Sequence, residues 1–191
     1  MRANNEHQNA KSESKLAPRL LVQSSCKSVI YSPLKNIDIS EWLFSLGDAE
    51  YQQGSISHIA CGSSRAADGK LMSLNVEEIG GSIVVGHYVE DILERQHCRV
   101  TSISDVFVQG SRTTVHVVWE LSVTPLTDGS CEFLNLVTVH TTDDYEVFIE
   151  HSGITYEQAK AAMESAVGAH NAEETPLFAK SIERKALSTG R

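Results

Sequence analysis

The segment 112–123, with the sequence RTTVHVVWELSV, constrains the fold of this chain more than any other stretch. From Val115 to Val123 its odd-numbered positions are apolar, whereas its even-numbered positions are mostly polar. A period of two, with many β-branched and aromatic residues, is typical of a β-strand with one buried face. We therefore predict a strand whose odd-numbered side chains point into a hydrophobic core.

Short turn signals divide the chain around this strand into segments of similar length. Four dipeptides suit tight hairpins because they accept positive φ angles, and these are Asp68-Gly69, Gly80-Gly81, Gly110-Ser111 and Asp128-Gly129. Six consecutive antiparallel strands are predicted over 56–66, 70–79, 82–92, 98–108, 112–124 and 131–141. A further strand over 20–31 precedes them.

Helical periodicity is present before and after these six strands. Asp38 and Glu41 fit a capping box that opens a short apolar stripe, which predicts one or two short helices after the first strand. A second capping box begins at Thr155 and opens a longer stripe that continues to Leu187. This pattern predicts a long C-terminal helix, kinked or restarted near Pro176.

Length and composition narrow the class of protein. A chain of 191 residues suits one domain, which we place at 20–191 after a disordered polar tail at 1–19. The formal net charge of -9 disfavours a nucleic-acid partner. No apolar run approaches the ~20 residues that insert into a membrane, and no secretory signal is evident. We therefore expect a cytoplasmic protein with free thiols at its four cysteines, for which a homodimer is an open alternative.

Two-residue loops at the four turns would set the strand registers and hence the direction of each side chain. These registers predict a mostly apolar inner face and a solvated outer face. The predicted inner face holds Ile59, Cys61, Met72, Leu74, Val76, Val85, Val89, Val100, Val106, Val115, Val117, Trp119, Leu121, Leu134 and Leu136. The predicted outer face holds His58, Asn75, Glu77, Tyr88, Glu90, His116 and Glu120.

Two histidines interrupt the apolar rows of the predicted inner face. His87 and His140 fall at one depth, with Ser102, Ser104 and Thr138 nearby. The two serines point inward only if the turn before their strand has the right length. An imidazole titrates near neutral pH, so the histidines are candidates for a general acid and a general base. Core histidines bonded to a neighbour are the alternative interpretation.

Other polar residues give weaker signals. His116 and Glu120 look like an acid and base pair, but four residues of strand separate them by ~13 Å, so we interpret them as surface residues. His170 lies on the stripe of the C-terminal helix and could approach His87 or His140. No HxH or HExxH spacing supports a metal ion, and no P-loop or dinucleotide fingerprint supports another cofactor, so we predict neither.

The order of elements, the SEWLFSL segment, and the EEIGG turn followed by HYVEDI carry a family resemblance over residues 25 to 187. The chain resembles the START / Bet v 1-like helix-grip superfamily, including polyketide cyclase/dehydratase-like proteins. The resemblance implies an α+β fold in which a seven-stranded curved antiparallel sheet surrounds a long C-terminal helix. A ligand cavity would lie between them. Lipocalin-like barrels and cystatin-like domains are the rival folds.

The resemblance also implies a function, although this superfamily has no universal catalytic residues to carry over. We expect a hydrophobic, polyketide-like or aromatic ligand and cofactor-independent cyclisation, dehydration or a related proton transfer. A carrier or sensor without chemistry is the alternative, and an interaction module with a filled cavity is a third. The candidate catalytic residues are His87 and His140. The candidate substrate-binding residues are Trp119, Val117, Leu121, Ser102, Ser104, Thr138, Leu74, Val85, Met163 and His170.

Overall fold

The computed structural model describes residues 17–189, so the predicted polar tail lies almost entirely outside the described residues. The strands are β1 (Leu20–Ile30), β2 (His58–Arg65), β3 (Leu71–Ile79), β4 (Ser82–Leu93), β5 (His97–Val108), β6 (Ser111–Pro125) and β7 (Cys131–Thr141). The helices are η1 (Leu34–Asn36), α1 (Ile39–Ser45), α2 (Asp48–Tyr51), α3 (Asp143–Ser152) and α4 (Tyr156–Thr189).

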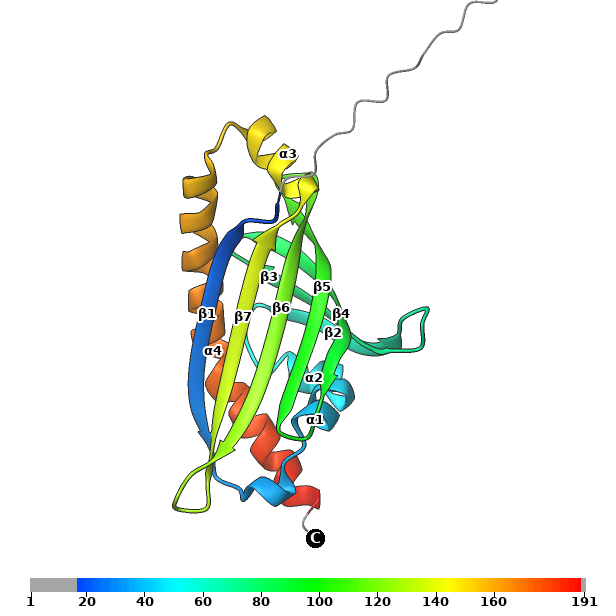
Figure 1. Cartoon of the computed structure of the whole chain (residues 1–191), viewed down its shortest axis with the longest axis vertical. Coiled ribbons are helices and arrows are strands. Elements are labelled where there is room, and N and C mark those ends of the chain that lie inside the picture. Colours follow the sequence, from blue (N-terminus) through cyan, green and yellow to red (C-terminus); the bar gives the residue numbers. More distant parts are fainter. Residues whose placement is uncertain (1–16, 190–191) are drawn as a thin grey trace, which may run out of the picture.

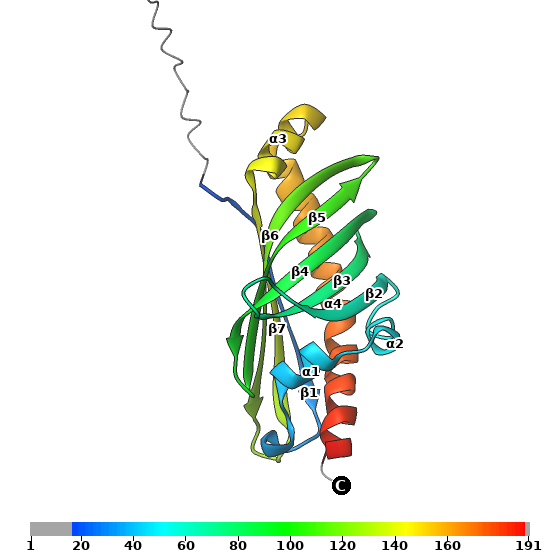
Figure 2. The same cartoon turned by 90° about the vertical axis from the view of Figure 1, so that its right-hand side faces the viewer.

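The seven strands form one antiparallel sheet in the order β1-β7-β6-β5-β4-β3-β2. The sheet is strongly curved, and α4 lies along its concave side (Figures 1 and 2). The α+β helix-grip fold predicted from the sequence is therefore confirmed, with α1 and α2 as the short helices after the first strand. Within residues 17–189, no helix has both the length and the apolarity needed to cross a bilayer.

Side-chain caps explain where two helices begin. Asp38 accepts a hydrogen bond from the backbone N–H of Glu41 at 2.9 Å, which caps α1 as predicted. At the start of α4, the N–H of Gln158 donates to the Thr155 hydroxyl at 3.2 Å. The N–H of Thr155 donates in return to the side chain of Gln158 at 2.8 Å. This reciprocal pair is the second capping box predicted from the sequence.

The sequence predicted a kink or a restart at Pro176, and because α4 continues through this proline, the restart is excluded. A proline removes one N–H and leaves the carbonyl four residues earlier without its helical partner. That carbonyl belongs to Ala172, and both residues are exposed, so water can satisfy it. Thr175 does not cap a new helix, because its hydroxyl donates to the carbonyl of Asn171 at 2.6 Å.

In two hairpins, the residues that share a face are the ones predicted to do so. Gly80 and Gly81, with φ angles of 59° and 79°, form the β3–β4 turn as predicted. The β5–β6 turn is formed by Gln109 and Gly110, one residue earlier than predicted. The pairing therefore shifts by two residues, which leaves every side chain on its face. The predicted inward orientation of Val117, Trp119, Leu121, Ser102 and Ser104 is confirmed by their burial.

The β6–β7 hairpin corrects the predicted orientation of β7. Its loop holds three residues, because the N–H of Leu126 donates to the carbonyl of Ser130 at 2.8 Å. Trp119 consequently pairs with Val137 instead of Thr138. A shift of one residue reverses both faces of a strand. The outer face of β7 therefore carries Leu134, Leu136, Thr138 and His140, and the inner face carries Phe133, Asn135, Val137 and Val139.

A β-bulge reverses the predicted faces of β4 and β3. The register between β4 and β5 shifts by one residue between Glu90 and Ile92. Before the bulge, Val84 and Tyr88 face the concave side, so Val85, His87 and Val89 point outward. Because β3 pairs with β4, its orientation is reversed too. The outward residues of β3 are Met72, Leu74 and Val76, and the inward residues are Ser73, Asn75 and Glu77.

The β2–β3 hairpin, like the β6–β7 hairpin, has one more loop residue than predicted. The N–H of Ala66 donates to the carbonyl of Lys70 at 2.9 Å, which makes a three-residue loop instead of a two-residue one. Cys61 therefore pairs with Asn75. At the start of β2, a second register shift turns His58 into the core and leaves Ile59 exposed. Both orientations are the reverse of the prediction.

Substitutions at two aliphatic positions of α4 test how the helix packs in the core. Ile182 is 1% exposed, and Leu187, one and a half turns further on, is 55% exposed. We expect Ile182→Ala to lower the free energy of unfolding by about 2–5 kcal/mol, because it leaves a cavity in the core. Leu187→Ala should change it by less than about 0.5 kcal/mol. Urea denaturation followed by circular dichroism measures both values, and equal losses would contradict this packing.

Candidate functional site

A cavity of about 500 Å³ lies between the inner face of the sheet and α4. Its mouth is bordered by the exposed residues Gly80, Gln109 and Ile154, from the β3–β4 turn, the β5–β6 turn and the segment between α3 and α4. Its walls are mostly apolar. They include Val84, Val106, Val115, Val117, Trp119, Val137, Val139, Met163 and Val167.

The inner end of the cavity is polar. Its lining there consists of Tyr51, Asn75, Glu77, Tyr88, His170, Asn171 and Glu174. The inward side chains of β3 supply one side of this end, and α4 supplies the other. Because neighbouring inward positions in a strand lie two residues apart, Asn75 and Glu77 reach the same cavity.

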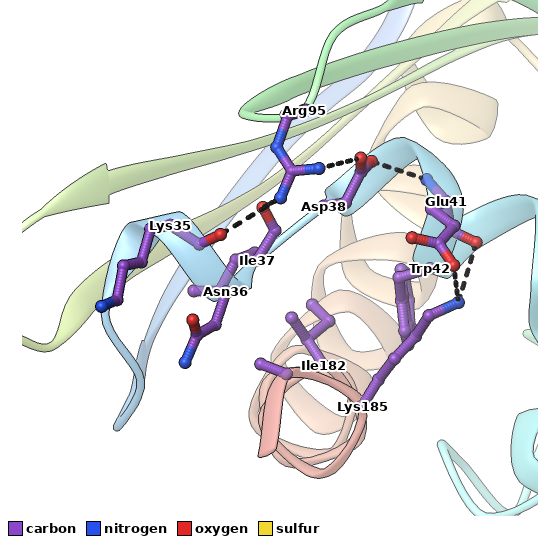
Figure 3. A pocket seen from close by; sticks show the side chains of 10 residues that line it. Lys35, Asn36, Ile37, Asp38, Glu41, Trp42, Arg95, Ile182 and Lys185 are labelled. Carbon is purple, nitrogen blue, oxygen red and sulfur yellow. Dashed lines mark hydrogen bonds and ion pairs between the residues drawn. The ribbon is translucent and has the colours of Figure 1, made fainter. Parts of the chain in front are cut away.

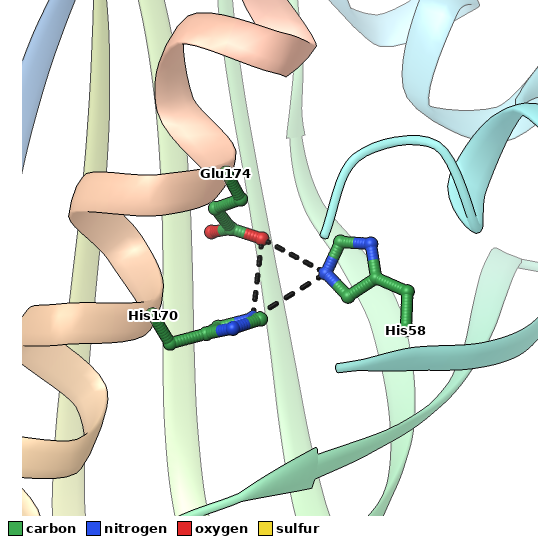
Figure 4. Close-up of side chains that lie close together, drawn as sticks. All are labelled: His58, His170 and Glu174. Atoms are coloured by element: carbon green, nitrogen blue, oxygen red, sulfur yellow. Dashed lines mark hydrogen bonds and ion pairs between the residues drawn. The ribbon is translucent and has the colours of Figure 1, made fainter. Parts of the chain in front are cut away.

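At this polar end, four ionisable side chains converge on one point, and Figure 4 shows three of them. The Nε2 atoms of His58 and His170 are 3.3 Å apart. Glu174 Oε2 lies 3.2 Å from His58 Nε2 and 3.4 Å from His170 Nε2. Glu77 Oε2 lies 3.1 Å from His170 Nε2 and 3.7 Å from His58 Nε2. We call these four residues the His-Glu cluster.

Buried partners hold the His-Glu cluster in place. His58 Nδ1 lies 2.7 Å from the carbonyl of Tyr51, and the two rings stack with centroids 3.9 Å apart. The Tyr51 hydroxyl donates to Glu77 at 3.3 Å. On the other side, the Asn135 amide donates to Glu174 Oε1 at 2.9 Å and accepts the indole N–H of Trp119 at 2.8 Å.

In the His-Glu cluster, burial and the neighbouring charges shift the pKa values of His170 and Glu174 in opposite directions. Burial lowers the pKa of His170, but the carboxylates of Glu174 and Glu77 outweigh burial and raise this pKa to about 10. Burial raises the pKa of Glu174, but His170 and His58 outweigh it and lower this pKa to about 2. At neutral pH the protein without ligands therefore pairs a cationic His170 with an anionic Glu174.

Tyr88 places a phenol in the wall of the cavity. Its ring covers Gly86, where an added Cβ would lie 2.3 Å from a ring carbon, so only glycine fits beneath it. The ring also packs edge-on against Trp119, with centroids 5.5 Å apart. Burial, with the charges of Glu77 and Glu174, raises the pKa of Tyr88, and a hydrogen bond with Ser104 opposes this shift. The hydroxyl therefore stays protonated and can donate.

The residues proposed from the sequence are divided between the two faces of the sheet. Trp119, Val117, Met163 and His170 line the cavity. Leu121, Ser102 and Ser104 point inward but lie outside the cavity lining. The remaining five are misplaced by the one-residue shifts and lie on the outer face, namely His87, His140, Thr138, Leu74 and Val85.

The two candidate catalytic histidines, His87 and His140, therefore lie on the convex side of the sheet, outside the cavity. The His140 ring stacks on His116, with centroids 5.9 Å apart, on the convex side of the sheet. Burial, and secondarily the charge of His140, lowers the pKa of His116. The backbone N–H of His87 donates to the Ser102 hydroxyl at 2.8 Å, but its side chain points away from the cavity.

The sequence analysis missed most of the His-Glu cluster. It placed His58 and Glu77, and also Tyr88, on the solvated face, because the predicted strand registers differ by one residue from the observed ones. One usable signal was present on α4. His170 and Glu174 are four residues apart, which places them on one side of the helix.

A second cavity, of about 120 Å³, lies where α1 meets the C-terminal part of α4 (Figure 3). The guanidinium of Arg95 donates to the Asp38 carboxylate at 2.9 Å and to the carbonyl of Ile37 at 3.2 Å. The ammonium of Lys185 lies 3.4 Å from the Glu41 carboxylate. Because these charges pair with one another, the larger cavity is the better candidate for a ligand site.

The Asn135 amide is predicted to be essential for the stability of the site. Asn135→Ala would leave the indole N–H of Trp119 and one oxygen of Glu174 without these partners in the core. We expect a loss of about 2–4 kcal/mol in the free energy of unfolding, because buried polar groups without partners are costly. Thr138→Ala, on the outer face of the same strand, should cost less than about 0.5 kcal/mol. Chemical denaturation of both variants checks the reversed faces of β7, and a larger loss for Thr138→Ala would refute them.

No protein-family model and no curated protein matches this chain. Solved structures do match. The Zhui aromatase/cyclase from Streptomyces sp. R1128 is 12% identical, with a TM-score of 0.60 over 89% of this chain and 96% of that one. A protein from Thermus thermophilus is 11% identical, with a TM-score of 0.53 over 89% of this chain and 100% of that one.

A third match is one half of a longer protein. The di-domain aromatase/cyclase StfQ from the steffimycin biosynthetic pathway is 11% identical, with a TM-score of 0.50 over 88% of this chain and 51% of that one. At these identities the similarity concerns the fold. The chain thus has the START / Bet v 1-like helix-grip fold, with its cavity between the sheet and the C-terminal helix.

Proposed function

We propose that the protein binds a polyketide-like or aromatic small molecule in the larger cavity and catalyses its cyclisation, dehydration or a related proton transfer. The observation that carries this proposal is the distribution of polarity, with mostly apolar walls and the ionisable side chains gathered at the inner end. A volume of about 500 Å³ suits a small organic molecule. An elongated ligand would bury its hydrocarbon part along the walls and direct its oxygen atoms inward.

Two groups at the inner end suit carbonyl chemistry. The Tyr88 hydroxyl, which burial keeps protonated, would donate a hydrogen bond to a carbonyl oxygen. The carboxylate of Glu77, which lines the same end, would accept a proton from carbon. Trp119 would form an apolar wall beside the reacting atoms.

The proposed reaction is an intramolecular aldol condensation. Glu77 removes a proton from a CH₂ group between two carbonyls, and the resulting enolate carbon bonds to a carbonyl carbon of the same molecule. The oxygen of that carbonyl becomes an alkoxide, which Tyr88 stabilises and to which Glu77 returns the proton. Loss of the new hydroxyl with a neighbouring C–H proton then releases one water for each ring that closes.

The structural similarity to an aromatase/cyclase with a TM-score of 0.60 supports this reading. A second candidate function is a carrier or sensor of the same kind of ligand. It is favoured by the position of His87 and His140 outside the cavity, which removes the imidazoles expected to act on the substrate. All four cysteines are free thiols in this structure.

Filling the cavity should abolish ligand binding. Val84 lines the cavity, whereas its neighbour Val85 points to the opposite face of β4. We expect Val84→Trp to weaken binding of the apolar dye 1-anilinonaphthalene-8-sulfonate at least 10-fold, because the indole would occupy the part of the cavity that the dye fills. Val85→Trp should bind the dye like the wild type. Fluorescence titration measures both affinities, and the reverse order would contradict the assigned cavity.

Turnover separates an enzyme from a carrier. With a linear poly-β-ketone thioester as the test substrate, we expect the wild type to form a cyclised, dehydrated product detectable by liquid chromatography and mass spectrometry. Glu77→Gln should lower kcat by about 10²–10⁴-fold, as expected for loss of a general base. Tyr88→Phe should lower it by about 10²-fold, as expected for loss of one donor to a developing oxyanion.

Tyr31→Phe is the matched control for Tyr88→Phe, because Tyr31 is 72% exposed, and it should leave kcat unchanged. If the wild type binds the thioester and returns it unchanged, the carrier function replaces the enzymatic one. If both cavity variants turn over normally, the assigned roles of Glu77 and Tyr88 are wrong.

A further inference from the structure

The His-Glu cluster has a second property that does not depend on the cavity ligand. We propose that His58, His170 and Glu174 bind a divalent transition-metal ion of the zinc class. Each residue offers one ligand atom, and His58 and Glu174 are buried while His170 is nearly so. Two of the ligands come from one turn of α4, and the third comes from the start of β2.

The distances between the three ligand atoms match a metal site. They are 3.3 Å between the two Nε2 atoms, and 3.2 and 3.4 Å from these atoms to Glu174 Oε2. Zinc binds imidazole nitrogen and carboxylate oxygen at roughly 2.0–2.2 Å, so tetrahedral ligands lie roughly 3.3–3.6 Å apart. The triangle in Figure 4 therefore has nearly the dimensions of one face of such a tetrahedron.

Hydrogen bonding satisfies this arrangement poorly. Because His58 Nδ1 lies 2.7 Å from the Tyr51 carbonyl, it donates to this carbonyl, and Nε2 is the ring atom that faces the cluster. His170 Nε2 has three polar atoms around it, Glu77 Oε2, Glu174 Oε2 and His58 Nε2, at 3.1–3.4 Å. One N–H cannot point at all three, whereas a cation between them attracts all of them at once.

The partners of the ligands resemble the supporting contacts of metal sites. Metal-binding histidines usually donate the other ring N–H to a carbonyl or a carboxylate, as His58 does to Tyr51. The second oxygen of Glu174 accepts from Asn135, which in turn is held by Trp119. These contacts orient His58 and Glu174 before any ion arrives, so little ordering is required on binding.

Charge and position also suit a divalent ion. Glu77 and Glu174 bring two negative charges into the protein interior, and they are 7% and 5% exposed. A 2+ ion at the centre of the cluster would balance these charges. Two histidines and one carboxylate are a known ligand set for zinc and for non-haem iron, which leaves further coordination positions open. Glu77 Oε2, 3.1 Å from His170 Nε2, is placed to fill one of them or to accept from a metal-bound water.

The experiment is a titration of the full-length, metal-free protein with Zn²⁺ and with Co²⁺. We expect one ion per chain by native mass spectrometry, a higher melting temperature with Zn²⁺, and visible absorption bands of Co²⁺ held by nitrogen and oxygen. His170→Gln and Glu174→Gln should each weaken Zn²⁺ binding at least 100-fold in calorimetry. Asn135→Ala, which removes the contact that orients Glu174 but no ligand atom, should weaken it about 10–100-fold.

The convex side of the sheet supplies a matched control. His116 and His140 are the other close histidine pair within residues 17–189, and a double His116→Gln and His140→Gln variant should bind Zn²⁺ like the wild type. The proposal is overturned if the wild type binds neither ion, if the convex-side double variant loses the ion, or if Glu174→Gln retains full affinity. Circular dichroism of Glu174→Gln, which keeps the shape of the side chain, distinguishes loss of ligation from loss of fold. None of these readouts depends on turnover of the thioester.

Discussion

The buried amide of Asn135 is the interaction on which the geometry of the site depends. It joins Trp119 on β6 to Glu174 and Thr175 on α4, through bonds of 2.8, 2.9 and 3.2 Å. Apolar packing alone would let a helix rotate about its axis at little cost, whereas hydrogen bonds are directional. Asn171, one turn earlier, adds a second anchor by donating to Ser24 on β1. These amides determine which side of α4 faces β2 and β3, and therefore where the helix presents its histidine and carboxylate.

The His-Glu cluster is costly for folding. Buried carboxylates such as Glu77 and Glu174 lose the hydration that they have in the unfolded chain, and an ion pair in the interior often fails to recover this loss. A core of similar volume built from leucine and phenylalanine would be easier to stabilise. Perturbed titratable groups beside a cavity are, for this reason, a signal of function. In this protein His170 combines both features, because it borders the cavity and contacts both carboxylates.

The overall fold could be predicted from the sequence, because periodicity, capping residues and turn dipeptides are local signals. The alternation around Trp119 identified β6, and Thr155 identified the start of α4. The site could not be predicted equally well, because it depends on which face of the sheet each side chain occupies. A single extra loop residue exchanges the two faces of a strand. The loop that ends at Gly129 has three residues instead of two, and the bulge after Glu90 has no distinctive sequence. The extra loop residue places His140 on the convex side, and the bulge places His87 there.

The reversal of β3 is informative in its own right. This strand has one apolar set of side chains and one polar set, and the polar set faces the interior. Burial of apolar surface favours the opposite orientation, so the pairing with β4 must override it. Sequence and structure usually conflict in this way where function requires it. The cavity shows what the conflict achieves, since β6 and much of α4 offer a ligand mostly apolar contacts, whereas β3 offers Asn75 and Glu77. A ligand with oxygen atoms would therefore have one favourable orientation, with its polar part toward β3 and the His-Glu cluster, and chemistry or metal binding would be confined to that end.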